Sequence, residues 1–301
     1  MNHAPSSPAD PDRLHRFLLD KAGVRGILVR LDDAWTRIRE TSDYPGPVAE
    51  RLGEACVAAA LFTGHAKVDG RLSIQLKGTG PLRTLFAECT AEGTLRGIAH
   101  HADTVPDPLT PRQLGQGSLM AITIENHPPG ARDVQRYQGL VDLDADSFME
   151  AFEGYFDRSE QLPTRLRLVS SDGRAAGLML QQLPGDVGDA DGWTRAQALF
   201  ETLTDEELLR LPAHDLLWRL FNEEDVRVLG DSALRFRCSC SRERVAAMLE
   251  GLGREEARAA TATGIAEVRC EFCGTAYTFT PDEIEALFDR PLTGEGSDRL
   301  Q

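Results

Sequence analysis

Hydrophobic and polar positions follow the two-residue period of β-strands in much of the first half of the chain. Val24–Leu31 is apolar and rich in β-branched residues, and Gly70–Ala99 contains short alternating runs separated by turn residues. Met120–Glu125 and Gln138–Leu143 have the same character. Runs of this length and composition predict strands. Ala91–Gly93 predicts a hairpin turn, because glycine tolerates a positive φ.

A helical period marks two other segments of the same region. Apolar residues recur at helical spacing from Val48 to Phe62, and Gly64 follows as a terminator. Ser147–Arg158 carries a second apolar helical face. Several strands with few helices predict an α+β fold, in which the N-terminal domain contains substantial antiparallel sheet.

A more acidic and more helical segment follows this domain. The composition of Pro184–Gly192 predicts a hinge. Thr204 and Glu207 form a capping box that opens a helix, and Pro212 ends this helix. Residues 185–231 contain twelve Asp or Glu against four Arg, a net charge of −8, together with many large apolar side chains. Self-repulsion lowers the stability of such a segment, so we expect a metastable helical linker. The alternative is an ordinary helical connector packed on the core.

The chain as a whole is acidic. Its 301 residues include 33 Lys and Arg and 48 Asp and Glu, which gives a net charge of −15. This charge repels phosphate backbones and anionic lipids, so neither nucleic acid nor a membrane is an expected partner. The longest uncharged apolar run, Ala55–Gly64, is far shorter than the roughly 20 residues of a bilayer span. The N-terminus lacks the pattern of a secretory signal, so we expect a cytoplasmic protein with reduced thiols.

Four of the six cysteines form two close pairs, Cys238 with Cys240 and Cys270 with Cys273. Four thiolates arranged in this way suit one tetrahedral zinc ion per chain, with two ligands from each pair. Gly274 permits the tight turn that such a pair requires. Buried thiols, a dithiol redox centre and an iron–sulfur cluster are the alternatives.

The residues around the two pairs predict a compact domain. Val245–Leu252 has helical spacing after a Ser241 cap, and Thr280–Glu283 is a capping box with proline at the first helical position. Short β-like runs flank the second pair. The predicted organisation is a disordered tail (1–11), an α+β core domain (12–184), a metastable helical linker (185–231), a small zinc-binding domain (232–290) and a second tail (291–301).

The cysteine pairs could also act as a redox switch. Arg235, Arg237, Arg242 and Arg244 surround the first pair with only Glu243 opposing them, and positive neighbours favour thiolates and attract anionic oxidants. An equally good interpretation is that these arginines neutralise a zinc centre. Oxidation would remove the ligands, and the close spacing favours Cys238–Cys240 and Cys270–Cys273 disulfides. A domain of about 60 residues has little stability without its metal.

Other candidate sites are weaker. The chain contains no Walker A, G-x-S-x-G or H-E-x-x-H motif, so we expect no enzyme activity and no catalytic residue. Cys56 and Cys89 stand alone and are expected to be packing residues. His100 and His101 would point to opposite faces of a strand, which argues against a shared metal.

At this point the sequence resembles a known family, the redox-regulated heat-shock holdase called the 33 kDa chaperonin. The resemblance extends from about Leu14 to Phe288. The matching segments are Gly80–Leu82, Ala87–Thr90, Leu95–Gly97, Arg136–Gly139, Ser159–Thr164, Asn222–Arg227, Phe236–Arg244 and Cys270–Gly274. The C-x-C motif followed by C-x-x-C is highly specific in this context.

The resemblance implies an ATP-independent chaperone that is inactive when reduced and zinc-bound. Oxidants, usually with heat, would convert the four cysteines to two disulfides, release zinc, and unfold the C-terminal domain and the linker. The exposed apolar surface would hold unfolding client proteins. The resemblance also implies a homodimer as the active form and transfer of clients to ATP-dependent foldase chaperones.

One departure from the family and two rival functions complete the sequence-based picture. Gly253–Gly264 is rich in alanine where larger apolar side chains are expected, which puts the stability of the reduced zinc domain in question. The rivals are a zinc-ribbon module that binds nucleic acid through the arginines near Cys238, and a thiol oxidoreductase. Salt-dependent binding to RNA or DNA would favour the first, and turnover of a small dithiol would favour the second.

Overall fold

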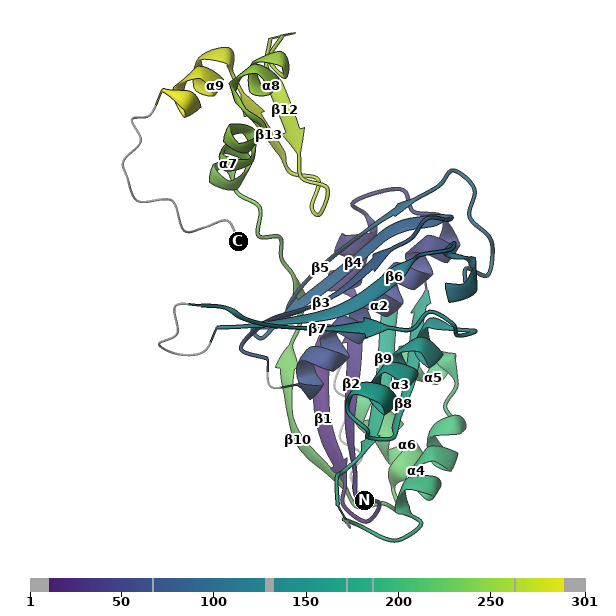
Figure 1. The fold of residues 1–301 in the computed structure, drawn as a ribbon. Coiled ribbons are helices and arrows are strands. Elements are labelled where there is room, and N and C mark those ends of the chain that lie inside the picture. The colour runs from purple at the N-terminus through teal and green to yellow at the C-terminus, as the bar shows by residue number, and fades with distance from the viewer. Residues whose placement is uncertain are drawn as a thin grey trace. The chain divides into compact units, whose positions relative to one another are not determined.

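The computed structural model describes residues 11–66, 68–127, 133–171, 173–185, 187–262 and 264–289, and the two predicted tails lie outside these ranges except for Pro11. The chain divides into two compact units, Met1–Arg237 and Cys238–Gln301. Each unit has its own elements and its own hydrophobic core, and each is described by itself (Figure 1).

The N-terminal unit contains two largely antiparallel sheets (Figure 1). The first has the order β10-β1-β2-β9-β8, from β10 (Val226–Ala233), β1 (Arg13–Leu19), β2 (Val24–Leu31), β9 (Arg174–Gln182) and β8 (Thr164–Ser171). The second has the order β11-β5-β4-β3-β6-β7, from β11 (Arg235–Phe236), β5 (Thr94–His101), β4 (Leu82–Thr90), β3 (Gly70–Lys77), β6 (Leu119–Asn126) and β7 (Gln135–Val141). All pairings are antiparallel except β11 with β5. The predicted α+β class with antiparallel sheet is confirmed.

Helix α2 (Gly46–His65) forms the centre of this unit, because it contacts strands of both sheets. Pro45 precedes it and a second proline lies in its first turn, where a missing N–H costs nothing. Almost every residue from Val48 to Phe62 is buried, as the sequence predicted for this helix. Shorter helical elements of the same unit are α1 (Asp33–Arg39), the 3₁₀ turn Pro111–Gln113 and α3 (Phe148–Ser159). Helix α4 (Gly192–Glu201) also belongs to this unit and lies at the start of the predicted linker.

We predict that Leu61→Ala destabilises the N-terminal unit by about 3 kcal/mol, because Leu61 is 0% exposed and its loss leaves a cavity between the helix and the sheets. Leu140→Ala is the matched control, since Leu140 on β7 is 67% exposed. Urea unfolding, followed by circular dichroism, measures both. Equal destabilisation by the two substitutions would contradict this description of the core.

A second core lies on the other face of the first sheet. Helices α4, α5 (Asp205–Arg210) and α6 (Ala213–Phe221) cover it with buried residues such as Phe200, Leu216 and Phe221. Their partners on the sheet include Phe17 and Leu28. The capping box predicted for α5 is present. The linker residues therefore fold as a helical layer on the core domain.

The sequence analysis was wrong about the end of this helical segment. It treated residues up to 231 as helical, whereas Val226–Ala233 is strand β10, which pairs antiparallel with β1. The backbone of this edge strand is satisfied by a partner more than 200 residues away, and most of its side chains are exposed. Neither feature leaves a local sequence pattern.

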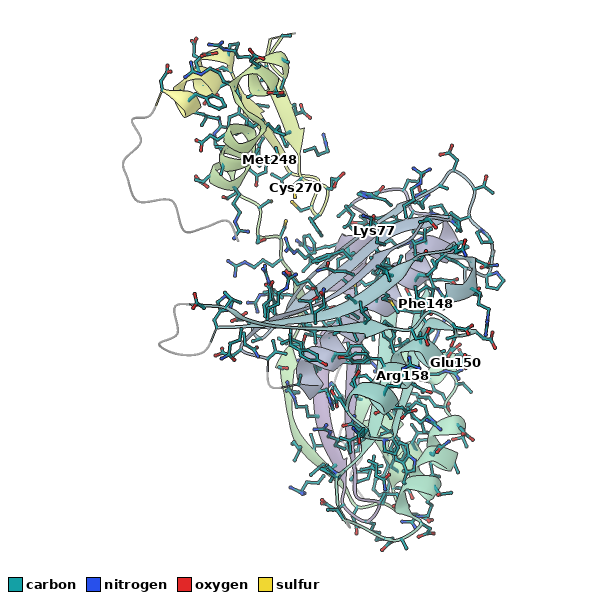
Figure 2. All side chains as sticks on the ribbon, viewed as in Figure 1. Lys77, Phe148, Glu150, Arg158, Met248 and Cys270 are labelled. Atoms are coloured by element: carbon teal, nitrogen blue, oxygen red, sulfur yellow. The ribbon has the colours of Figure 1, made fainter. Side chains whose placement is uncertain are left out.

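The C-terminal unit is a two-stranded sheet with three helices: α7 (Arg242–Leu252), α8 (Arg254–Ala259), β12 (Ala266–Arg269), β13 (Ala276–Phe279) and α9 (Pro281–Phe288). The Ser241 cap of α7 and the capping box of α9 are confirmed. On α7, Leu249 is buried, whereas Met248 is 48% exposed (Figure 2). Among the residues that the structure describes, no helix in either unit has the length and apolar character needed to span a bilayer.

Candidate metal centre

The four paired cysteines come from two short segments of the C-terminal unit. Cys238 and Cys240 lie just before helix α7, whose start is fixed by Ser241, the Oγ of which accepts a hydrogen bond from the Arg244 N–H. Cys270 and Cys273 lie in the turn between β12 and β13. The four-residue ladder of that hairpin sets the register of the turn. The two predicted ligand pairs are thus held by one helix start and one hairpin.

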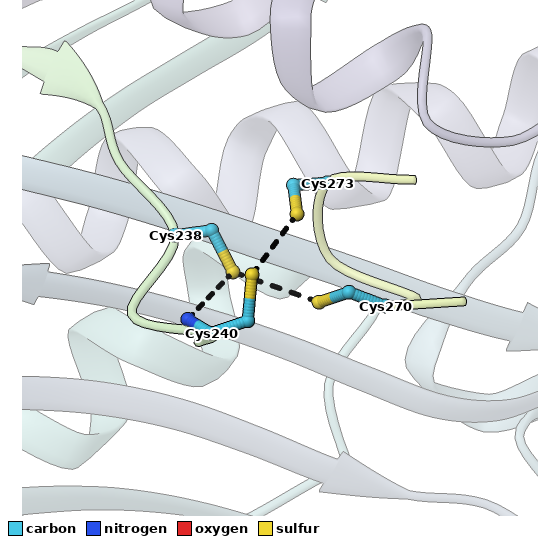
Figure 3. Close-up of side chains that lie close together, drawn as sticks. All are labelled: Cys238, Cys240, Cys270 and Cys273. Carbon is cyan, nitrogen blue, oxygen red and sulfur yellow. Dashed lines mark hydrogen bonds between the residues drawn. The ribbon is translucent and has the colours of Figure 1, made fainter. Parts of the chain in front are cut away.

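The structure brings the four sulfur atoms into one cluster (Figure 3). All lie within 4.8 Å of one another, with 3.6 Å between the Sγ atoms of Cys238 and Cys270 and 3.3 Å between those of Cys240 and Cys273. Four sulfurs at about 2.3 Å from a tetrahedral zinc ion are about 3.8 Å apart. The donor set and its spacing therefore fit a metal ion of the zinc type.

Hydrogen-bonding groups surround part of this cluster. The Tyr277 hydroxyl donates to Cys240 Sγ at 3.1 Å, and the Cys240 N–H donates to Cys238 Sγ at 3.5 Å. The Cys273 thiol donates to Thr275 Oγ1 at 3.2 Å. Gly274 has a φ of 70°, as the predicted tight turn requires. The arrangement supplies both the ligands and the neighbours that orient them, as metal sites generally do.

Two of the four thiols, Cys238 and Cys270, are poorly disposed to ionise. Burial raises the pKa of Cys238 to about 12 and also raises the pKa of Cys270. Burial acts in the same direction on Cys273, but hydrogen bonds with Thr275 and with the sulfurs of Cys240 and Cys270 together outweigh it and lower the pKa of that thiol to about 7. The hydrogen bond to Cys240 raises the pKa of Tyr277 to about 12, so its hydroxyl stays protonated and remains a donor. Binding a cation supplies the energy that converts such thiols to thiolates.

Two of the four arginines that the sequence analysis placed around the first pair, Arg242 and Arg244, have structural partners. Arg242 bonds to the Thr278 carbonyl and to Glu283, and its guanidinium stacks over the Phe279 ring at 4.2 Å. Arg244 donates to the Ser239 carbonyl at 2.7 Å. These two side chains therefore fasten the segment that carries Cys238 and Cys240, an arrangement that lends little support to a nucleic-acid contact.

The remaining candidates belong to the N-terminal unit. Cys56 and Cys89 are buried in its core, and burial raises the pKa of both thiols, that of Cys89 to about 12. His100 and His101 are consecutive residues of β5. The sequence analysis did not identify Thr275 and Tyr277 as sulfur partners. Their separation by two residues, with Thr275 immediately before β13 and Tyr277 within it, was the available signal.

Comparison with known proteins agrees with this geometry. A family model described as "Hsp33 protein" matches residues 12–280. The 33 kDa chaperonin of Nitrosococcus oceani is 43% identical over 278 residues, covering 92% of this chain and 94% of that protein. The one from Chromobacterium violaceum is 42% identical over 279 residues, covering 92% and 94%. The crystal structure of the Thermotoga maritima 33 kDa chaperonin has a TM-score of 0.76 at 23% identity, covering 92% of this chain and 98% of that one, and so shares the fold. The chain therefore belongs to the Hsp33 family of chaperones.

Proposed function

We propose that this protein is a redox-regulated, ATP-independent holdase whose switch is the cluster of Cys238, Cys240, Cys270 and Cys273. In the reduced state the four thiolates bind one zinc ion, which ties the segment before α7 to the β12–β13 turn. On oxidation they become the disulfides Cys238–Cys240 and Cys270–Cys273, which cannot serve as ligands. The observation that carries the proposal is the convergence of all four sulfurs in a unit with a very small core.

The core of the C-terminal unit supports the dependence on these ligands. Its buried apolar residues are Val245, Leu249, Ala257, Ala266, Phe279 and Ile284. Two of the six are alanines, and one of them, Ala257, lies in the alanine-rich segment that raised doubt about stability. So few buried groups contribute little against the entropy of ordering about 50 residues. A structural zinc, worth on the order of 10–16 kcal/mol in apparent binding, makes up the difference.

The proposed active surface is the apolar face of the linker, residues 185–231. This face is now buried against the first sheet of the core domain. Its repulsive net charge of −8 lowers the stability of the packed layer. Unfolding of the C-terminal domain would release it, and the exposed apolar side chains of linker and sheet would hold unfolding clients. We further propose that the active form is a homodimer in the cytoplasm that passes clients to ATP-dependent foldases without catalysing a reaction itself.

The test follows zinc and client aggregation together. Peroxide is added to the reduced, zinc-loaded protein at elevated temperature, while a chromogenic chelator reports zinc and light scattering reports aggregation of a heat-denatured client. We expect one zinc per chain to appear, the free thiols to fall from six to two, and scattering to be suppressed. Cys56 and Cys89 are expected to remain reduced, because both are buried in the core of the other unit.

Two variants sharpen the comparison. Cys270→Ser removes a ligand and is expected to lose zinc and its response to peroxide. Cys89→Ser changes a thiol outside the four-cysteine cluster and is expected to behave like the unaltered protein. Zinc release without suppression of aggregation would refute the chaperone mechanism. Retention of all six thiols under these conditions would refute the switch.

A further inference from the structure

The face of the first sheet that lies beneath the linker helices is basic as well as apolar. Its core includes Phe17 and Leu28, and alternation along each strand assigns the other positions to this face. Strands β1, β2, β8 and β9 contain no Asp or Glu. Arg165 pairs with Glu153 on α3, outside the linker. The arginines at positions of this face are Arg13, Arg30, Arg165, Arg167 and Arg174.

The linker that covers this face has the opposite charge. Its net charge is −8 over residues 185–231. Asp205, at the start of α5, accepts a hydrogen bond from Arg167 Nε on β8 at 2.8 Å. Asp231 on β10 pairs with Arg13 on β1. The linker therefore occupies the face as an apolar ligand with carboxylates would, through buried apolar groups and charge complementarity together.

Arg30 is a buried cation of this face to which the linker supplies no carboxylate within the described residues. It lies two residues after Leu28 on β2, and its β9 neighbour is Ala176, a residue of the core beneath the linker. Arg30 is 7% exposed, and within the described part of the chain its Nε and Nη2 have no hydrogen-bond partner. The carboxylate of Asp32 lies 3.4 Å from Arg174. Burial lowers the pKa of Arg30 to about 10, so the guanidinium is still charged at neutral pH.

An unpaired guanidinium under the linker favours replacement of the linker by a better ligand. Burying a charge without a partner is costly, and the cost is relieved when water or a carboxylate reaches the group. Nε and Nη2 lie on one edge of the guanidinium, which binds the two oxygens of a carboxylate side by side. An incoming acidic segment would thus satisfy a group that the linker leaves unsatisfied.

We propose that the face uncovered by release of the linker binds apolar client segments that carry Asp or Glu, with Arg30 as their main carboxylate partner. Arg13, paired with Arg30 across β1 and β2, and Arg167 lie on the same face. This inference rests on the proposed function, in which the linker leaves the sheet, and adds the chemical class of client. The net charge of the whole chain, −15, predicts the opposite preference, for basic segments.

The experiment compares three fluorescent peptides that differ only in charge. The acidic peptide has the sequence of Leu199–Leu211, the linker segment that contains α5. In the second peptide the corresponding amides replace its four acidic residues, and in the third lysine replaces them. The full-length protein is activated with peroxide and heat, and binding is followed by fluorescence anisotropy at about 0.15 M salt, where charges beyond about 8 Å are screened.

We expect the activated protein to bind the acidic peptide about tenfold more tightly than the amide peptide, because a charge-assisted hydrogen bond is stronger than a neutral one. The lysine peptide should bind most weakly. The reduced, zinc-loaded protein should bind none of the three, since the linker covers the face. Equal affinities, a preference for the lysine peptide, or equal binding by the reduced and activated protein would overturn the proposal.

Substitutions at Arg30 test its part in this preference. Arg30→Met keeps a long side chain without the charge and is expected to weaken binding of the acidic peptide about fivefold while leaving the amide peptide unaffected. Arg30→Lys should retain more of the preference than Arg30→Met. Arg83→Met is the matched control, because it changes the net charge equally at an exposed residue of β4 in the second sheet. The same preference in Arg30→Met and Arg83→Met would refute the role of Arg30.

A second variant covers the case in which Arg30→Met is not activated. An apolar side chain in place of a buried charge also stabilises the packed layer, so release of the linker is checked by hydrogen exchange in α5. Where the linker of Arg30→Met stays packed, Arg167→Met is measured instead and is expected to lose part of the preference for the acidic peptide. An unchanged preference in that variant would overturn the proposal.

The outcome is separable from that of the proposed function. If the activated protein selects the acidic peptide but does not suppress client aggregation, the charge selectivity of the face stands and the holdase function fails. If aggregation is suppressed while the three peptides bind equally, the holdase function stands and the selectivity is refuted.

Discussion

Removing the metal from the reduced protein with a strong chelator is expected to unfold residues 238–289 while the core of the N-terminal unit around α2 stays folded. Within its described residues, the C-terminal unit has six buried apolar residues in its core, whereas α2 alone buries more than that between two sheets. Losing an interaction worth on the order of 10–16 kcal/mol exceeds any stability that so small a core supplies. Hydrogen exchange with mass spectrometry should show loss of protection in β12, β13 and α7 and retained protection in α2.

Two variants provide the comparison for this experiment. Cys273→Ser is expected to reproduce the unfolded state without a chelator, because three thiolates and a hydroxyl bind zinc much more weakly than four thiolates. Cys56→Ser, in the core of the N-terminal unit, is expected to leave exchange in β12 and β13 unchanged. Persistent protection of these strands after complete chelation would show that the metal does not hold the unit together, and the proposed switch would then lack its driving force.

The parts of the fold that could be predicted from the sequence are those set by local patterns. The helix from Val48 to Phe62 and the strands around Val24–Leu31 and Leu82–Thr90 follow from periodicity, because each buries one face or both. The ligand pairs could be predicted because cysteine spacing encodes them directly. Strand β10 could not, since its exposed side chains give no pattern and its pairing with β1 joins distant parts of the chain.

The finer geometry of the site was also beyond the sequence. Thr275 and Tyr277 are common residue types in any hairpin, and only the register of β12 with β13 brings their hydroxyls to Cys273 and Cys240. The sequence analysis had suggested that the arginines near the first pair attract anionic oxidants. In the structure, Arg242 forms hydrogen bonds with the Thr278 carbonyl and Glu283 and stacks on the Phe279 ring, so its positive charge is engaged within the C-terminal unit.

The attachment of the linker to the core domain depends on a charged side chain that the sequence analysis did not identify. Arg195, on α4 near the start of the linker, bonds to both oxygens of Glu224 at 2.6 and 2.9 Å, and Glu224 is 2% exposed. It also contacts Asp189 and Asp191. The backbone around Glu224 bonds to the β1–β2 turn at Lys21, which in turn accepts a hydrogen bond from the Asp189 N–H. Arg195 thus links the first helix of the helical layer to the segment that follows its last helix, and both ends are hydrogen-bonded to the β1–β2 turn.

Arg195→Met is therefore expected to release the linker partly without any oxidation. Removing the guanidinium leaves the buried carboxylate of Glu224 without its partner, which favours the released layer. The reduced, zinc-loaded variant should show faster hydrogen exchange in α4 and α6 and should suppress client aggregation where the original protein does not. Arg210→Met is the control, because Arg210 forms only an exposed pair with Glu206 at 3.7 Å. If Arg195→Met keeps its full complement of zinc and its linker remains as protected as in the control, the helical layer is held by apolar packing alone, and its release must come entirely from the C-terminal unit.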